Sequence, residues 1–347
     1  MNEAVLVESV RELPFAHGGP PLRGVLRTSP DDFFVDEDLG FAPDGAGEHV
    51  FLRVEKRGAN TDWVARELAR FAGVDPAAVS YAGLKDRHAI TRQTFSLHLP
   101  GKAPEPDWTS LVHAEFRVLS AMRNSRKLQR GALESNFFRL VLRDVDGDRV
   151  AAERVLRAIA TQGVPNYFGE QRFGRDAGNL ARARAMFAGR RVQRHERSLL
   201  LSAVRSHLFN AVLAERVRRG DWNSGIDGEV WTLAGTQSIF GPEPLTDELS
   251  ARCASGDISP TGPLWGEGVL RTTQTVAAIE EEVASAYPDL IVGLQKNGLR
   301  HARRALVLRP SELSYRWLSD SALELELRLN SGSYATVIIR EFSAVAG

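Results

Sequence analysis

Cysteine is almost absent from the 347-residue sequence, because Cys253 is the only one. A single cysteine excludes a disulfide within the chain and a cysteine-rich zinc site, and it is typical of a reducing compartment. The histidines show neither an HExxH pattern nor a Cys/His spacing, so we expect no metal. No apolar run approaches the roughly 18 residues that a membrane span needs, and the first residues are charged where a signal peptide would be apolar. We therefore expect a cytoplasmic protein that does not enter a membrane.

Net charge is also absent, since Lys+Arg 44 balance Asp+Glu 44. No overall field therefore draws the protein to an anionic polymer, and any such partner must meet a local patch. The charges are segregated along the chain: acidic residues gather in 31–48, and basic residues gather in 117–143, 172–197 and 296–309. Each basic stretch alone is typical of a solvated helix face or strand edge. The three together favour a composite surface for phosphates.

Apolar periodicity predicts an α+β protein. Alternating apolar residues predict strands at four places, namely Val50–Val54, Phe95–Leu99, Phe138–Leu142 and Leu323–Leu329. An N-cap at Asn60 or Thr61 and a stop at Gly73 predict one helix, and a second helix ends at Gly163. A long helix is expected from about Ser198 to Arg219.

The texture of the sequence changes in its second half. Between about Val192 and Leu308 the patterns indicate helices joined by loops rich in glycine and proline, and strand patterns return only after Pro310. We interpret this change as an insertion. Residues 1–191 and 309–347 are then expected to form one discontinuous domain, and residues 192–308 an inserted domain.

The stretch YAGLKDRHAITRQ, residues 81–93, sets one carboxylate between two cations. A short strand is expected from Val79 to Leu84 and the next from Gln93, which leaves Asp86 in a connecting loop. Asp86 can cap a turn or form a surface ion pair with Lys85 or Arg87. Alternatively, it is an ionised nucleophile whose charged form the adjacent cations favour. Spacing alone does not decide between these interpretations.

Four motifs in order resemble the TruD family of tRNA pseudouridine synthases, over essentially the whole chain. They are LRTSPDDFFVDEDLGFAPDGAGEHVFLRV near the N-terminus, VSYAGLKDRHAITRQ, GVPNYFGEQRFGRDAGNL and GSYATVIIRE near the C-terminus. The resemblance implies a pseudouridine synthase fold with a mixed, mostly antiparallel sheet and an inserted α/β TRUD domain. It also implies isomerisation of uridine 13 in tRNA without a cofactor. The implied partner is the tRNA, and no obligate protein partner is evident.

The resemblance also implies roles for individual residues. Asp86 matches the family's nucleophile, which can attack the ribose C1′ or the base C6, or take a proton from the sugar; the sequence leaves these routes open. An extruded uracil needs aromatic faces and hydrogen-bonding groups. The matched positions for these are the rings of Phe33, Tyr334 and Phe168, the amide of Asn166, and Arg27 as the cation that pairs with Asp86.

Several of these positions have simpler interpretations. Phe33 and Tyr334 are also typical of strand residues that face a core, Asn166 of a turn, and Arg27 of an exposed arginine. Tyr334 stands where the family has phenylalanine, and Arg27 where relatives have lysine, so their geometry is expected to differ.

Two other functions stay open at this point. A non-catalytic RNA-binding protein on the same scaffold would use only the basic stretches, from which the candidates for backbone contact are Arg123, Arg126, Lys127 and Arg130. A glycoside or nucleoside hydrolase would need a second carboxylate, and Glu170 is the candidate. The product of the reaction discriminates between the three.

Overall fold

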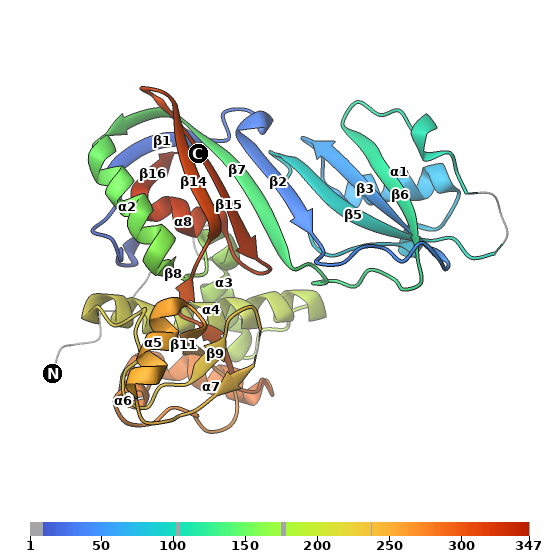
Figure 1. Cartoon of the computed structure of the whole chain (residues 1–347). Coiled ribbons are helices and arrows are strands. Elements are labelled where there is room, and N and C mark those ends of the chain that lie inside the picture. The colour runs from blue at the N-terminus through green and yellow to red at the C-terminus, as the bar shows by residue number, and fades with distance from the viewer. Residues whose placement is uncertain (1–9, 102–104, 175–177, 237, 347) are drawn as a thin grey trace. The chain divides into compact units, whose positions relative to one another are not determined.

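A computed structural model describes residues 10–101, 105–174, 178–236 and 238–346 (Figure 1). Contacts between residues divide the chain into two compact units, and each is described by itself. We name them by their content: the sheet unit holds residues 22–148, 310–333 and 344–347, and the helical unit holds residues 1–21, 149–309 and 334–343. The domain boundaries expected from the sequence, with an insertion at 192–308, differ from these units and stay a prediction. Among the described residues, no helix is long and apolar enough to cross a membrane.

The sheet unit is built on one mixed sheet, whose main path runs β14–β15–β7–β2–β5–β3–β6 (Figure 1). Its strands are β1 (Leu22–Leu26), β2 (Phe33–Asp38), β3 (His49–Arg57), β4 (Val79–Tyr81), β5 (Ile90–His98), β6 (Phe116–Asn124), β7 (Ser135–Gly147), β14 (Ser311–Ser319), β15 (Ala322–Asn330) and β16 (Ser343–Ala346). Along the main path β2 and β5 are parallel and the other pairs are antiparallel. The four strands expected from alternation form, in β3, β5, β7 and β15, and the α+β class is confirmed. The strand expected over Val79–Leu84 is shorter, since β4 ends at Tyr81, and the next strand begins at Ile90 and not at Gln93.

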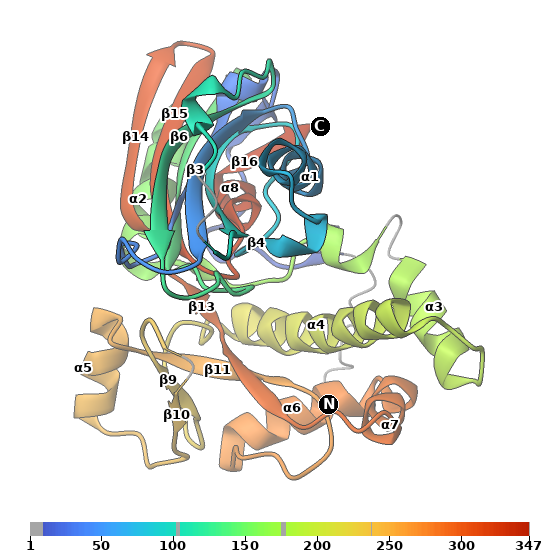
Figure 2. The same ribbon diagram turned by 90° about the vertical axis from the view of Figure 1, so that its right-hand side faces the viewer.

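One helix, α1 (Thr61–Ala72), packs on this sheet (Figure 2). As expected, it follows Asn60 and ends at Gly73, whose φ of 67° is left-handed and whose N–H donates to Ala69 and Arg70 carbonyls. Alternation in β3 turns Val50, Leu52 and Val54 toward α1, where they join Val64 and Leu68 in a buried core. The first turn of α1 thereby becomes a fixed support beside the loop between β4 and β5.

The helical unit combines helices with a small sheet. Its helices are α2 (Arg149–Gln162), α3 (Gly178–Phe187), α4 (Arg194–Arg219), α5 (Asp247–Ser255), α6 (Gln274–Ser285), α7 (Pro288–Lys296) and α8 (Ala335–Phe342). Its strands are β8 (Val164–Pro165), β9 (Trp231–Leu233), β10 (Ile239–Phe240), β11 (Ile258–Leu264), β12 (Ala302–Ala305) and β13 (Val307–Leu308). The long helix α4 begins four residues earlier than expected and ends at Gly220, which has a φ of 76°.

The expectation that strand patterns return only after Pro310 is wrong. Strands β9 to β12 form an antiparallel sheet in the order β10–β9–β11–β12, within the region interpreted as helices and loops. The central strand β11 has the sequence ISPTGPL, in which proline and glycine conceal the strand pattern. Gly262 is required there by packing, because a Cβ atom would lie 3.0 Å from the Phe209 ring of α4 and 2.8 Å from Leu306.

Candidate active site

Asp86 lies in the loop between β4 and β5, and its side chain is 27% exposed. One carboxylate oxygen, Oδ1, accepts the backbone N–H of His88 at 2.9 Å, which is the local turn expected for an aspartate in a loop. The other, Oδ2, lies 2.7 Å from Nη2 of Arg27. The carboxylate is therefore held in one orientation while part of it stays open to solvent.

Arg27 directly follows β1 and links Asp86 to an aromatic ring. Its φ of 64° is left-handed, an unfavourable conformation for a residue with a side chain. The guanidinium carbon lies 4.2 Å from the centre of the Phe33 ring, within the range of a cation–π contact. Phe33 begins β2, is 4% exposed and meets Phe138 edge-on. The structure thus brings Arg27, Phe33 and Asp86 together, with the arginine covering one face of the ring.

The cations next to Asp86 in sequence do not pair with its carboxylate, contrary to one of the interpretations above. Nζ of Lys85 lies 2.7 Å from Oε2 of Glu37, whose side chain is fully buried, and 2.8 Å from the amide oxygen of Asn136. Nε of Arg87 donates instead to the carbonyl of Gly58. Lys85 therefore anchors the loop to β2 and β7, and the cation that acts on the carboxylate is Arg27.

The loop before Asp86 is tied to α1 and β5 through a buried relay. The hydroxyl of Thr61 accepts the backbone N–H of Lys85 at 3.1 Å and donates to the amide oxygen of Gln93 at 2.9 Å. The amide nitrogen of Gln93 donates in turn to the carbonyl of Gly83 at 3.2 Å. Because the relay joins a helix start to a central strand, the loop is fixed on both sides.

Lys56 is a residue of this site that the sequence interpretation missed. It is fully buried near the end of β3, and its Nζ donates to the carbonyl oxygen of Asp86 at 2.8 Å. Burial lowers its pKa from 10.5 to about 8, with Asp86 opposing the shift and Lys85 adding to it. A signal was present in the sequence: the alternation of Val50, Leu52 and Val54 places position 56 on the buried face, where a lysine is out of place.

Asn166 belongs to the helical unit, where it directly follows β8. It is 7% exposed, and its Nδ2 donates to the carbonyl of Ala305 at 2.9 Å. Its Oδ1 accepts Nη2 of Arg304 at 2.7 Å. The side chain is therefore fixed by β12 and does not only form a local turn.

Phe168 and Tyr334 lie in the same unit, among arginines. The guanidinium carbons of Arg304 and Arg172 lie 4.3 Å and 5.4 Å from the centre of the Phe168 ring. Nη2 of Arg172 donates to the hydroxyl of Tyr334, which precedes α8 and is 36% exposed. Burial lowers the pKa of Arg304 to about 10. The structure thus gathers three predicted residues, Asn166, Phe168 and Tyr334, around Arg304 and Arg172, which only the basic stretches had signalled.

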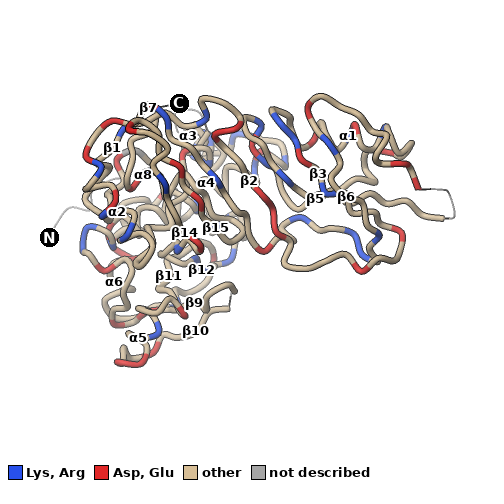
Figure 3. The backbone as a smooth tube through the Cα atoms, turned by 45° about the horizontal axis from the view of Figure 1, so that its top comes forward, with Lys and Arg blue, Asp and Glu red and all other residues tan. Residues whose placement is uncertain are grey.

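The four candidates for RNA backbone contact have unequal environments. Arg126, Lys127 and Arg130 are exposed between β6 and β7. Arg123 is instead engaged within the protein, because its Nε lies 2.9 Å from Glu105 and its Nη1 donates to a backbone carbonyl. Figure 3 marks the basic residues of the sheet unit in blue and the acidic stretch of β2 in red. Backbone contact by these residues stays a prediction.

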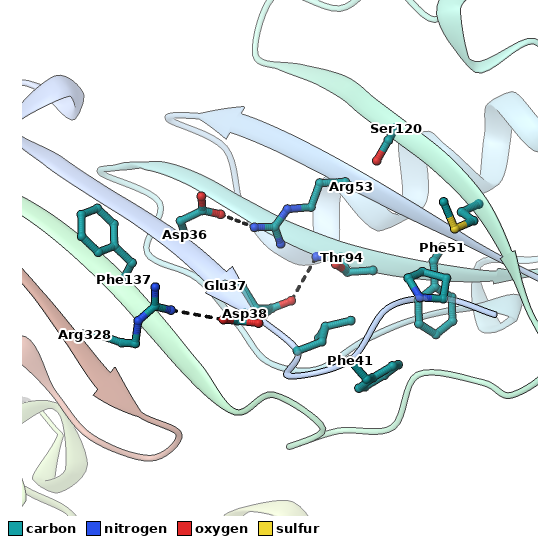
Figure 4. Close-up of a pocket in the computed structure, with 13 residues that line it drawn as sticks. Asp36, Glu37, Asp38, Phe41, Phe51, Arg53, Thr94, Ser120, Phe137 and Arg328 are labelled. Atoms are coloured by element: carbon teal, nitrogen blue, oxygen red, sulfur yellow. Dashed lines mark hydrogen bonds and ion pairs between the residues drawn. The ribbon is translucent and has the colours of Figure 1, made fainter. Parts of the chain in front are cut away.

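A cavity of about 580 Å³ lies elsewhere on the sheet unit, and none of the predicted site residues lines it (Figure 4). Its charged groups are already paired: Arg53 with Asp36, and Arg328 with Asp38 at 3.2 Å. Oε1 of Glu37 accepts the backbone N–H of Thr94 at 3.0 Å. The charged side chains of this cavity therefore already have partners within the protein, and we assign no function to it.

Chemically, the site around Asp86 presents one oriented carboxylate beside a cation and an aromatic ring. Such a group can act as a nucleophile or as a base toward a bound base or sugar. Glu170, the candidate second carboxylate of a hydrolase, is exposed and belongs to the helical unit. Within the described residues, no group of three or more His, Cys, Asp or Glu side chains is arranged to hold a metal ion.

Comparisons with known proteins agree on one family. The family model of tRNA pseudouridine synthase D (TruD) matches residues 12–182 and 179–342. The chain is 48% identical to the tRNA pseudouridine synthase D of Xanthomonas axonopodis pv. citri, over 96% of this chain and 95% of that protein. It is 47% identical to that of Methylococcus capsulatus, over 95% and 94%.

A solved structure has the same fold. A crystal structure from Methanosarcina mazei, assigned as tRNA pseudouridine synthase D (TruD), superposes with a TM-score of 0.74 and covers 95% of each chain at 20% identity.

Proposed function

This chain belongs to the TruD family of tRNA pseudouridine synthases, and we propose that it converts uridine 13 of tRNA to pseudouridine with Asp86 as the nucleophile. Pseudouridine synthases are isomerases, so the protein is an isomerase that acts on tRNA. The observation that carries the role of Asp86 is its setting: a partly exposed carboxylate, oriented by Arg27 and by the His88 N–H. The choice of position 13 rests on the family resemblance alone.

The reaction balances without a cofactor. The bond between uracil N1 and ribose C1′ breaks, the base turns, and a bond forms between C5 and C1′, while one proton leaves C5 and one is gained at N1. The carboxylate of Asp86 can assist by attacking C1′ or C6, or by removing a proton from the sugar. Each route is faster when the carboxylate is oriented before the base arrives, and the contacts of Asp86 with Arg27 and with the His88 N–H orient it.

Uracil recognition is assigned to the remaining site residues. Phe33 places an aromatic ring beside Asp86, at 4% exposure and with one face covered by Arg27. In the helical unit the same role is assigned to Tyr334, which is 36% exposed, and to Phe168, which is 6% exposed. The amide of Asn166 keeps one N–H and one lone pair beyond those used by Ala305 and Arg304, which suits the donor and acceptor edge of uracil.

The tRNA backbone is assigned to the exposed cations Arg126, Lys127 and Arg130, which contribute affinity and orientation and carry no information on sequence. A tRNA substrate accords with a cytoplasmic location, which stays a prediction.

The test is to incubate unmodified tRNA with the wild type and with Asp86→Asn, and to map pseudouridine by mass spectrometry. Asparagine keeps the size of the side chain and its acceptor for His88, so only the negative charge is lost. Asp31→Asn is the matched control, because it removes an aspartate that pairs with Arg57 on the surface of the same unit. We expect product at uridine 13 from the wild type and the control and none from Asp86→Asn, while all three bind tRNA.

Each other outcome has a distinct meaning. Equal product from Asp86→Asn would remove Asp86 from its role. Product at another uridine would contradict the assignment of position 13. Binding of tRNA without any product from the wild type would favour the non-catalytic RNA-binding protein.

A further inference from the structure

Lys56 occupies a position that packing alone does not explain. It continues the buried face of β3, and its register partners in the neighbouring strands are Thr91 and Phe116. The side chain is fully buried, yet it forms no ion pair with any carboxylate of the described residues. A buried ammonium without a carboxylate is costly, so a methionine or leucine would suit this site better on grounds of stability.

The partner of the Lys56 ammonium is the residue assigned as nucleophile. Nζ donates to the carbonyl oxygen of Asp86 at 2.8 Å. Two other charges act on this ammonium: the carboxylate of Asp86 attracts it, and Lys85 repels it. The repulsion is moderated because Lys85 pairs with Glu37, and the attraction is moderated because Asp86 pairs with Arg27.

We propose that Lys56 is a positioning residue for the isomerisation: its buried ammonium holds the backbone of Asp86 and keeps a positive charge near the reacting carboxylate. The inference rests on the proposed role of Asp86. The hydrogen bond fixes the backbone from which the carboxylate projects, and a displacement of about 1 Å at a reacting group costs on the order of 10²-fold in rate. Because Lys56 is fully buried, it acts through Asp86 and does not touch the tRNA.

The titration of Lys56 separates this role from simple packing. Its pKa of about 8 means that the ammonium is charged below pH 8 and neutral above it. The rate of the chemical step should therefore fall as pH rises through this value. Titration of the uracil itself affects the wild type and the variants alike, so the difference between their pH profiles isolates Lys56.

The experiment measures single-turnover rate constants and tRNA affinity from pH 6.5 to 9.5 for the wild type, Lys56→Met and Lys56→Gln. Methionine keeps the length of the side chain without a donor, and glutamine keeps a neutral donor. Val54→Ala is the matched control, because it weakens packing on the same buried face without contacting Asp86. Asp86→Asn is measured in parallel.

We expect Lys56→Met to lower the rate constant by about 10²-fold at pH 7 and Lys56→Gln by less, with tRNA affinity unchanged. The ratio of the wild-type rate constant to that of either variant should fall as pH rises through about 8, because only the wild type carries Lys56. Val54→Ala should keep the wild-type rate constant per folded molecule and the wild-type pH profile.

Three results would overturn the inference. If the Lys56 variants keep the wild-type rate constant and profile while Asp86→Asn is inactive, Lys56 has no positioning role and the proposed function stands. If Val54→Ala shows the same loss of rate as Lys56→Met, the effect belongs to packing. A wild-type rate for Asp86→Asn would refute both the proposed function and the role of Lys56.

Discussion

Replacing Lys56 by methionine should make the protein more stable at neutral pH, although it should lower activity. The pKa of Lys56 falls from 10.5 to about 8, and each pKa unit corresponds to about 1.4 kcal/mol, so burial of the ammonium costs about 3 kcal/mol. Methionine removes this cost but also loses the hydrogen bond to Asp86, which lowers the stability of the variant by about 1 kcal/mol. The expected net gain at pH 7 is about 2 kcal/mol in the free energy of unfolding.

The gain in the free energy of unfolding should disappear at high pH, and the direction of this change follows from the lowered pKa of Lys56. Below pH 8 the lysine is charged in the folded and unfolded states, and the full cost is present. Between pH 8 and 10.5 the folded protein releases a proton that the unfolded chain keeps, so the stability of the wild type rises with pH. Lys56→Met lacks this rise of about 3 kcal/mol, so the two proteins should be equally stable at about pH 9.5, and at pH 10.5 the wild type should be the more stable by about 1 kcal/mol, the value of the lost hydrogen bond.

Urea denaturation at pH 7, 8, 9 and 10.5 provides the assay, followed by tryptophan fluorescence, since Trp63 and Trp108 pack in the core that β3 and α1 build. Lys127→Met is the matched control, because it makes the same chemical change at an exposed site. Its difference from the wild type should stay near zero at every pH. A Lys56→Met protein that is less stable at pH 7, or a difference that does not change with pH, would refute the reasoning.

Two further predictions concern the surface and the helical unit. Replacing Arg126 and Lys127 together by glutamine should weaken tRNA binding. If each residue contacts one phosphate, the slope of log K against log salt concentration should become less steep by about 2, as measured by filter binding at several salt concentrations. An unchanged slope would assign both residues to ordinary solvated surface. Gly262→Ala should lower the free energy of unfolding by about 1–3 kcal/mol, because the added Cβ meets Phe209 and Leu306. A melting temperature equal to that of the wild type would show that α4 and β11 can separate slightly to admit a methyl group.

The fold was predictable where local signals agree. Helix α1 has an N-cap residue, an apolar stripe and a terminal glycine, and it forms between Asn60 and Gly73 as the sequence predicts. The region that contains β11 was not predictable in this way, because its glycine serves close packing against Phe209 and resembles a loop signal. When a residue type is required by a contact with a residue distant in sequence, the neighbouring sequence does not indicate its secondary structure.

The site divides along the same line. The sequence motifs indicated Asp86 and its ion pair with Arg27, and the structure shows that pair. The alternative interpretation, an ion pair of Asp86 with Lys85 or Arg87, is wrong, because sequence neighbours need not be spatial neighbours: the ammonium of Lys85 pairs with Glu37. Lys56 is 30 residues from Asp86, and only the pairing of β3 with β5 shows why it is close. Loop anchors of this kind are tertiary contacts, and periodicity cannot reveal them.

Two locally unfavourable features lie next to Asp86, and one explanation, catalysis, accounts for both. Arg27 holds a left-handed backbone conformation that favours glycine, and Lys56 is a fully buried cation. Selection for stability alone would remove either feature. Both, however, contact Asp86: Arg27 pairs with its carboxylate, and Lys56 donates a hydrogen bond to its carbonyl oxygen. A site that gives up stability at two separate points to orient a single carboxylate is more economically explained by catalysis than by folding. Arg27→Gly and Lys56→Met should then share one outcome: relief of local strain or burial cost, together with a slower chemical step.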